Sequence, residues 1–232
     1  MATIHFIGGE KGGVGKSVVA RVMAQYFIDR GIAFTGFDTD RSHGALLRFY
    51  SDYAQPIDLN AYHSVDELIE AAVALPEQHI LVDLAAQSYD PLANWLLESG
   101  VFAVAEELEI KLIYWHVMDS GQDSVALLAR LLDQMGEQFQ YVIVQNQLRD
   151  EHFSLLMRSG LKEKALMMNA QLMTLKKLYA PIMLKIDAHN ASFWAATQRE
   201  PGANANVLGI LDRQRLKIWL NSAYTQLDRL VS

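Results

Sequence analysis

The chain has 232 residues, of which 51% are apolar and 20% are charged, and its formal net charge is −7. This length and composition can bury a substantial core, so we expect one domain over residues 1–232, and the negative charge argues against a protein that coats nucleic acid over its whole surface. The absence of cysteine excludes disulfides, thiolate zinc sites and cysteine-bound iron–sulfur clusters. No segment has the pattern of a secretion signal or of a membrane span, so we expect a cytoplasmic protein that does not bind membranes.

Residues 3–19, TIHFIGGEKGGVGKSVV, predict an apolar strand, a glycine-rich loop and the start of an amphipathic helix. In such a turn the backbone N–H groups point at phosphate oxygens, and the helix N-terminus adds a partial positive charge. We therefore predict a phosphate-binding loop in which Lys16 reaches the β- and γ-phosphates and Ser17 binds Mg²⁺. Glu10 stands where the usual pattern has its first glycine, and a second lysine, Lys11, follows it. The residues that we expect to contact the nucleotide are Gly12, Gly13, Val14, Gly15, Lys16, Ser17 and Val18.

The segment KGGVGKS, residues 11–17, resembles the deviant Walker A motif of the ParA/MinD family of P-loop ATPases. In that family the early lysine crosses a dimer interface to the phosphates of the partner's nucleotide. The resemblance therefore implies an ATP-bridged homodimer in which Lys11 acts in trans in catalysis. The alternative is a glycine-rich turn that binds nothing. A dinucleotide fold is disfavoured because G-x-G-x-x-G is absent from this turn.

Residues 33–38 predict a second strand, which delivers Asp38, Asp40 and the loop Arg41–His43 to the edge where open α/β sheets bind their ligands. The string FDTDRSHG, residues 37–44, resembles the switch I segment of ParA-like proteins. This match implies that Asp40 either orients the attacking water or assists in binding Mg²⁺. Asp38 is a second candidate for the Mg²⁺ contact. The alternative for both acids is an ordinary carboxylate at a strand end or a helix cap.

Residues 79–84 form a near-continuous apolar run, as expected for a strand that is covered on both faces. An apolar strand with Asp83 at its end resembles Walker B, in which the carboxylate holds Mg²⁺ directly or through water. The resemblance makes residues 84–88 switch II, where the family more often has glycine or proline. Gln87 then becomes a candidate contact to the γ-phosphate or to water. The alternative for Asp83 is a buried structural acid.

Residues 111–118 and 140–144 predict two further strands, and the second of them delivers Asn146 and Arg149. In the resembling family an asparagine at this strand end hydrogen-bonds the nucleotide base, and a carboxamide suits the adenine edge. We therefore expect ATP, with Asn146 at the base and Arg149 beside the nucleotide. The alternative is an asparagine that is present for its turn preference.

The segment 155–186 carries six basic residues against one acid, a net charge of +5 in a chain whose total is −7. This local basicity makes the segment the best candidate for a contact with DNA backbone or with an acidic partner. The alternative is a solvated face of scattered lysines. The residues that we expect to make the DNA contact are Lys162, Lys164, Lys176 and Lys177.

Residues 181–187, PIMLKID, predict a sixth strand, and residues 211–231 predict a final helix that docks on the domain through one apolar stripe. The string RQRLKIW, residues 213–219, together with IHF, AQYFIDRG and DTD near the N-terminus, resembles TraL-type NTPases of plasmid conjugal-transfer regions. This second resemblance shifts the expected context toward mobile elements.

The predicted elements combine into an α/β fold, a doubly wound, mostly parallel sheet of about six or more strands with helices on both faces. The ParA/MinD resemblance implies an ATP-dependent dimerising switch that hydrolyses ATP with Mg²⁺ and is stimulated by an unidentified partner protein. Its expected setting is plasmid or chromosome partition, cargo positioning or DNA transfer. Two alternatives stay open: a metabolic P-loop enzyme, such as a small-substrate kinase or an amidoligase, and a nucleotide-binding module with little hydrolysis.

Overall fold

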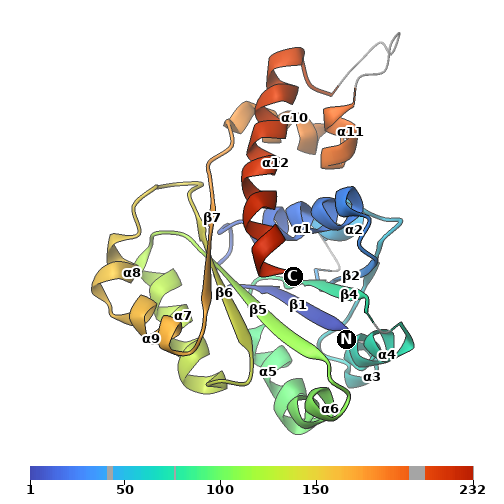
Figure 1. The fold of residues 1–232 in the computed structure, drawn as a ribbon, viewed down its shortest axis with the longest axis vertical. Coiled ribbons are helices and arrows are strands. Elements are labelled where there is room, and N and C mark those ends of the chain that lie inside the picture. The colour runs from blue at the N-terminus through green and yellow to red at the C-terminus, as the bar shows by residue number, and fades with distance from the viewer. Residues whose placement is uncertain (41–43, 76, 199–206, 232) are drawn as a thin grey trace.

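A parallel β-sheet runs through the centre of the molecule (Figure 1). The computed structural model describes residues 1–40, 44–75, 77–198 and 207–231. In these residues the sheet has seven strands in the order β3-β2-β4-β1-β5-β6-β7. Every neighbouring pair is parallel, so the chain has to return between strands through helices, and the predicted α/β fold is confirmed. The strands are β1 (Thr3–Gly8), β2 (Phe34–Asp38), β3 (Ala54–Pro56), β4 (His79–Asp83), β5 (Lys111–Met118), β6 (Gln140–Asn146) and β7 (Gln171–Leu175).

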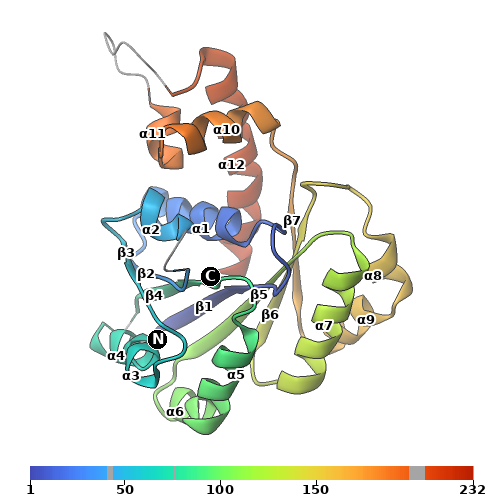
Figure 2. The same cartoon turned by 180° about the vertical axis from the view of Figure 1, so that it is seen from behind.

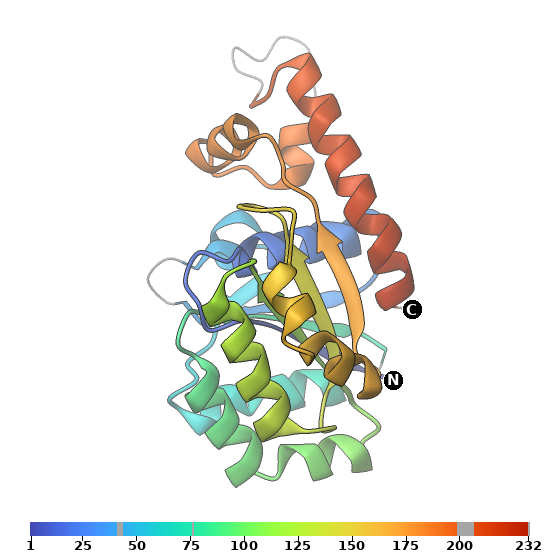
Figure 3. The same cartoon turned by 90° about the vertical axis from the view of Figure 1, so that its left-hand side faces the viewer.

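Helices cover both faces of the sheet, and each face has its own hydrophobic cluster (Figures 1 and 2). In Figure 3, α10, α11 and the beginning of α12 extend beyond the body of the molecule. One face carries α1 (Lys16–Arg30), α2 (Ala45–Phe49), α10 (Ala180–Ala188), α11 (Phe193–Thr197) and α12 (Ile210–Leu230). The other carries α3 (Tyr62–Val65), α4 (Glu67–Ala74), α5 (Tyr89–Glu98), α6 (Val101–Glu107), α7 (Gln122–Met135), α8 (Ser154–Arg158) and α9 (Leu161–Met167).

The central strands are buried along nearly their whole length. All six residues of β1 are buried, and so is β5 after its first residue. Because helices exclude water from both faces, such strands appear in the sequence as continuous apolar runs, which is why they were predicted. The two unpredicted strands form the edges of the sheet. β3 is a three-residue strand that contains Gln55 and Pro56, and Gln171 and Thr174 interrupt the apolar pattern of β7.

The predicted sixth strand over residues 181–187 is wrong, because this segment is the helix α10. Pro181 lies in the first turn of α10, where a missing N–H costs no helical hydrogen bond. Ile182 and Ile186, four residues apart, are 0% exposed, whereas Leu184 between them is 69% exposed. A spacing of four places both isoleucines on one helical face, so the apolar residues of this segment follow a helical period.

The predicted final helix is confirmed as α12, which packs through a stripe of buried apolar side chains. Along the described part of the chain, no helix combines the length and the apolar character needed to cross a lipid bilayer. The buried stripe consists of Leu216, Leu220, Ala223 and Leu227.

Candidate nucleotide-binding site

The carboxyl ends of three neighbouring strands bring the predicted phosphate-binding and acidic residues together. β4 lies between β1 and β2, and its register places Asp83 beside Ile7 on one side and Asp38 on the other. The loops that follow these strands enclose a cavity of about 320 Å³. Three motifs that are far apart in the sequence therefore line one cavity. Its lining residues are Gly12, Gly13, Gly15, Lys16, Ser17, Val18, Asp38, Asp40, Asp83, Leu84, Ala85 and Ala86.

The glycine-rich loop has the backbone geometry of a phosphate cradle. Gly13 and Gly15 have φ values of 74° and 96°, in the left-handed region that side chains rarely adopt. α1 begins at Lys16, so the free N–H groups of its first turn face the cavity. The ammonium of Lys16 donates to the carbonyl oxygen of Lys11 at 3.2 Å. Burial lowers the pKa of Lys16, although Asp83 and Glu10 act in the opposite direction.

Two buried carboxylates also line this cavity. Asp83 is 2% exposed, and its Oδ1 has no hydrogen-bond partner within the described residues. Burial, together with the neighbouring Asp38, raises the pKa of Asp83 to about 8, while a hydrogen bond from Ser17 acts in the opposite direction. Burial also raises the pKa of Asp38, although this carboxylate accepts backbone N–H groups from Asp40 at 3.0 Å and Leu47 at 3.1 Å.

This arrangement fits a hydrated divalent cation that shares its ligands with a nucleotide. An unpartnered, buried oxygen of Asp83 next to the Ser17 hydroxyl is an oxygen donor set of the kind that Mg²⁺ prefers. Nowhere in the described ranges do three or more His, Asp or Glu side chains form a cluster that could hold a metal ion alone. Mg²⁺ characteristically binds one or two carboxylates and takes its other ligands from water and phosphate.

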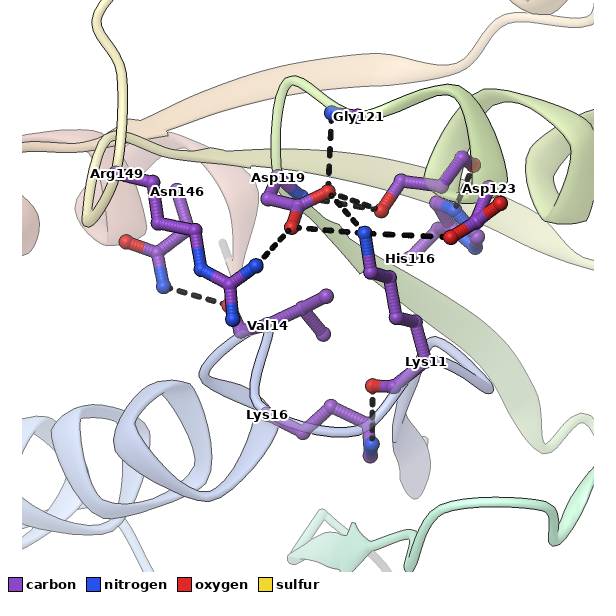
Figure 4. A network of polar contacts seen from close by, with 10 residues as sticks. Lys11, Val14, Lys16, His116, Asp119, Gly121, Asp123, Asn146 and Arg149 are labelled. Carbon is purple, nitrogen blue, oxygen red and sulfur yellow. Dashed lines mark hydrogen bonds and ion pairs between the residues drawn. The ribbon is translucent and has the colours of Figure 1, made fainter.

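Lys11 is held within its own chain by acids at the beginning of α7 (Figure 4). Its Nζ lies 3.1 Å from Oδ2 of Asp119 and 3.6 Å from Oδ2 of Asp123. The same Asp119 oxygen lies 3.4 Å from Nη1 of Arg149. Burial raises the pKa of Asp119, but hydrogen bonds from Ser124 and Gly121 and the nearby ammonium of Lys11 outweigh burial. The pKa of Asp119 therefore lies below its ordinary value. The predicted role of Lys11 in trans stays a prediction.

Asn146 and Arg149 lie beside the glycine-rich loop. Nδ2 of the buried Asn146 donates to the carbonyl oxygen of Val14 at 2.7 Å, so this side chain ties β6 to the loop. A Cβ at Gly15 would lie only 2.2 Å from the same Nδ2, which requires glycine there. The Arg149 side chain is 58% exposed and lies near Gly13. The predicted base contact of Asn146 stays a prediction.

The remaining predicted residues are divided among several places. Arg41–His43 of the predicted switch I loop lie outside the described residues. Gln87 is exposed and has a φ of 61°, a left-handed conformation in the loop between β4 and α5. Lys162 and Lys164 lie on α9, where Lys164 forms an ion pair with Asp133. The pair Lys176 and Lys177 is exposed in the loop after β7.

Three residues of the site were not singled out from the sequence. Asp119 follows a long apolar strand, which is the same signal that identified Asp83, so it could have been found. Thr39 gives no such signal, yet its Oγ1 accepts the backbone N–H of Ala85 at 2.7 Å and ties switch II to the end of β2. Arg130 lies in the middle of α7 and contacts Glu10, a pairing that no local pattern predicts.

Solved structures of other proteins share this fold. MinD cell division protein from Aquifex aeolicus superposes with a TM-score of 0.55 at 13% identity, over 98% of this chain and 97% of that one. A putative plasmid partition protein from Borrelia burgdorferi bound to AMPPNP superposes with a TM-score of 0.51 at 11% identity, over 95% of this chain and 99% of that one. The chain therefore has the fold of MinD/ParA-type P-loop ATPases.

The relatives in sequence agree with the predicted resemblance to TraL-type proteins. The chain is 28% identical over 243 aligned residues to Protein TraL of Escherichia coli, with 98% of each chain covered. It is 27% identical over 140 residues to Protein MobD of Acidithiobacillus ferrooxidans, with 56% of this chain and 58% of that one covered. No protein-family model matches the chain.

Proposed function

We propose that this protein is an ATP-dependent switch: it binds ATP with Mg²⁺, pairs with a second copy of itself, and separates after hydrolysis. The observation that carries the proposal is the cavity in which the glycine-rich loop and Lys16 meet Asp38, Asp40 and Asp83. A cradle of N–H groups facing buried acids suits a triphosphate and its metal ion.

Each group around the cavity has a distinct task in this proposal. The N–H groups of the loop and Lys16 bind the phosphate oxygens, and Asp40 orients the attacking water. Ser17 and Asp83, assisted by Asp38, would hold Mg²⁺, which neutralises charge that develops on the transferred phosphate. Asn146 keeps the loop against β6 through its bond to Val14 and contacts the adenine edge.

Dimerisation depends on Lys11 in this proposal. Asp119 and Asp123 hold its ammonium in the single chain, and the phosphates of the partner's nucleotide offer stronger, charge-assisted hydrogen bonds in the dimer. A charge supplied across an interface can accelerate phosphoryl transfer by roughly 10³-fold or more. Pairing and turnover would therefore be coupled.

The relatives support a setting in plasmid transfer or partition. TraL and MobD are the relatives in sequence, and a plasmid partition protein is among the structural neighbours. We propose that the ATP-bound dimer engages DNA or a partner protein, and that the exposed Lys176 and Lys177 belong to the contact surface. Such a protein would hydrolyse ATP slowly alone and faster with its partner.

The test is the oligomeric state with ADP and with a non-hydrolysable ATP analogue, each with Mg²⁺, measured by light scattering. We expect monomers with ADP and dimers with the analogue. Lys11→Ala should still bind nucleotide in calorimetry but stay monomeric, whereas Lys16→Ala should lose nucleotide binding itself. A Lys11→Ala chain that dimerises like the original would exclude the trans role.

A phosphate-release assay separates the proposed switch from the two alternatives. The switch is supported if turnover depends on protein concentration and rises with DNA or a macromolecular partner. A requirement for a small acid would instead indicate a metabolic enzyme. Nucleotide binding without release under any of these conditions would indicate a binding module. If adenine nucleotides with Mg²⁺ give no binding heat, all three functions fail.

A further inference from the structure

Two departures from the usual P-loop pattern lie close to one arginine, Arg130. Glu10 replaces the first glycine of the phosphate-binding motif, and switch II lacks its usual glycine or proline. Nη1 of Arg130 donates to Oε2 of Glu10 at 3.3 Å, and its Nη2 donates to Oδ1 of Asp90. The guanidinium also lies 4.9 Å from the centroid of the Tyr89 ring. One side chain of α7 thus contacts Glu10 and the first turn of α5, which directly follows the loop of residues 84–88.

The contacts of Arg130 lie next to two loops, the phosphate-binding loop and the loop of residues 84–88. Glu10 directly precedes Lys11 and the loop that cradles phosphate, and Tyr89 and Asp90 directly follow the switch II loop of residues 84–88. α5 and α7 lie beside each other in Figures 2 and 3, with Arg130 facing the beginning of α5. A displacement at either segment would therefore stretch the contact of Arg130 with the other.

We propose that Arg130 is a positioning residue that couples the phosphate-binding loop to switch II, so that nucleotide binding at Lys16 fixes the conformation of residues 84–90. The inference rests on the proposed ATPase function. Arg130 acts through Glu10 on one side and through Asp90 and the Tyr89 ring on the other, and it does not touch the nucleotide.

The exposure of these groups argues against a role that is only structural. The side chains of Arg130 and Asp90 are 40% and 67% exposed, and ion pairs as open as this contribute little to folding stability. Glu10 is 19% exposed, so its end of the contact is better shielded and its electrostatic interaction is stronger.

Residues 87–89, where the loop after β4 leads into α5, have two features that are unusual in a well-packed region. The hydroxyl of Tyr89 is buried without a hydrogen-bond partner in the described residues, and it shares a cavity of about 10 Å³ with Glu10, Tyr114, His116 and Arg130. Unsatisfied buried polar groups are rare in well-packed junctions. Two residues before Tyr89, Gln87 adopts a left-handed conformation that costs energy for a residue other than glycine. Both features lie beside the contact of Arg130 with Tyr89 and Asp90.

The experiment compares Arg130→Gln with the unchanged protein in three measurements: nucleotide affinity from the binding of a fluorescent ATP analogue, steady-state phosphate release, and hydrogen exchange of residues 84–90. We expect the affinity to change by less than about threefold and kcat to fall by about fivefold or more. The protection of residues 84–90 that the nucleotide induces should disappear. A role that is only structural would not separate affinity from kcat in this way.

Arg30→Gln is the matched control. Arg30 forms an ion pair with Asp228 in which both side chains are 44% exposed, and it lies at the far end of α1. The same substitution there should leave kcat and the exchange of residues 84–90 unchanged. Glu10→Gln breaks the contact from its other side and provides a second variant if Arg130→Gln does not fold. The double variant Glu10→Gln/Arg130→Gln should be no worse than the poorer single variant, because both remove one interaction.

The outcomes separate this inference from the proposed function. If the unchanged protein neither binds nor hydrolyses ATP, the proposed function fails, and the inference fails with it. If the unchanged protein turns over ATP and both single variants match it in kcat and in exchange, the inference alone is overturned. A separation of kcat from affinity in either variant, absent from Arg30→Gln, supports the coupling.

Discussion

At the scale of single residues, Asn146 shows how one side chain supports the phosphate-binding loop. Its Nδ2 reaches the carbonyl oxygen of Val14 at 2.7 Å in a buried position, across the gap that Gly15 leaves open. A carbonyl that loses such a partner stays buried and unsatisfied, because water has no access to it. Asn146 therefore stabilises the loop conformation before any nucleotide binds.

We expect Asn146→Ala to lower the free energy of unfolding by about 1–3 kcal/mol, the cost of an unsatisfied buried acceptor. Urea unfolding measures this loss. Binding of ATP and GTP to the variant should weaken together, because the loop serves both triphosphates. Any additional loss for ATP alone measures the proposed contact of Asn146 with the adenine edge. Unchanged stability together with unchanged affinity for both nucleotides would exclude the supporting role.

At the scale of elements, the central strands contain a histidine pair that is kept neutral. Nε2 of His5 on β1 lies 2.8 Å from Nδ1 of His79 on β4, and Nε1 of Trp115 on β5 donates to Nδ1 of His5 at 3.1 Å. These bonds require the neutral tautomer of His5 in which Nε2 carries the proton. Burial lowers the pKa of His79 to about 4 and that of His5 well below its ordinary value, and Lys111 adds to both shifts.

The lowered pKa values of these histidines make the folded protein less stable as the pH falls. The unfolded chain takes up a proton near pH 6.5, whereas the folded chain resists until about pH 4, so the stabilisation is complete above pH 6.5 and is lost as the pH falls toward 4. Each such histidine changes the free energy of unfolding by up to roughly 1.4 kcal/mol per pH unit in this window. His79→Gln should make the decline measured by urea unfolding less steep. A slope in His79→Gln equal to that of the original protein would refute the assignment.

The same elements show which parts of the fold could be predicted. Strands buried on both faces have continuous apolar sequences, and an acid at such a strand end, as with Asp83, indicates a site. The edge strand β3 could not be predicted, because three residues carry no period and their pairing depends on β2. The segment of α10 resembles a strand because Ile182, Met183 and Leu184 form a short apolar run, although Pro181 and the spacing of Ile182 and Ile186 indicated a helix.

Contacts between distant elements explain what could not be predicted at the site. The residues of the glycine-rich loop were recognisable because the backbone conformation of that loop restricts the sequence locally. The pairing of Glu10 with Arg130 depends on how α7 packs against the sheet, and no pattern along the chain reports that packing. The contact of Lys11 with Asp119 likewise exists only because β1 and β5 are neighbours.

At the scale of the whole molecule, the basic segment is divided between two surfaces. Lys162 and Lys164 lie on α9, and Lys164 is already paired with Asp133. Lys176 and Lys177 are exposed just after β7, whose last residue pairs with Asn146 at the end of β6. This second pair is therefore at the same edge of the sheet as the nucleotide site.

We expect Lys176→Ala/Lys177→Ala to weaken binding of double-stranded DNA in the presence of a non-hydrolysable ATP analogue, and Lys162→Ala/Lys164→Ala to weaken it less. Each lost phosphate contact lowers the slope of log K against log salt by about 0.9, so the first double variant should lose a slope of about 2. Fluorescence anisotropy over a salt series measures both quantities, with unchanged dimerisation as the control. Equal salt slopes in the two double variants and the original protein would show that none of these four lysines contacts DNA phosphate.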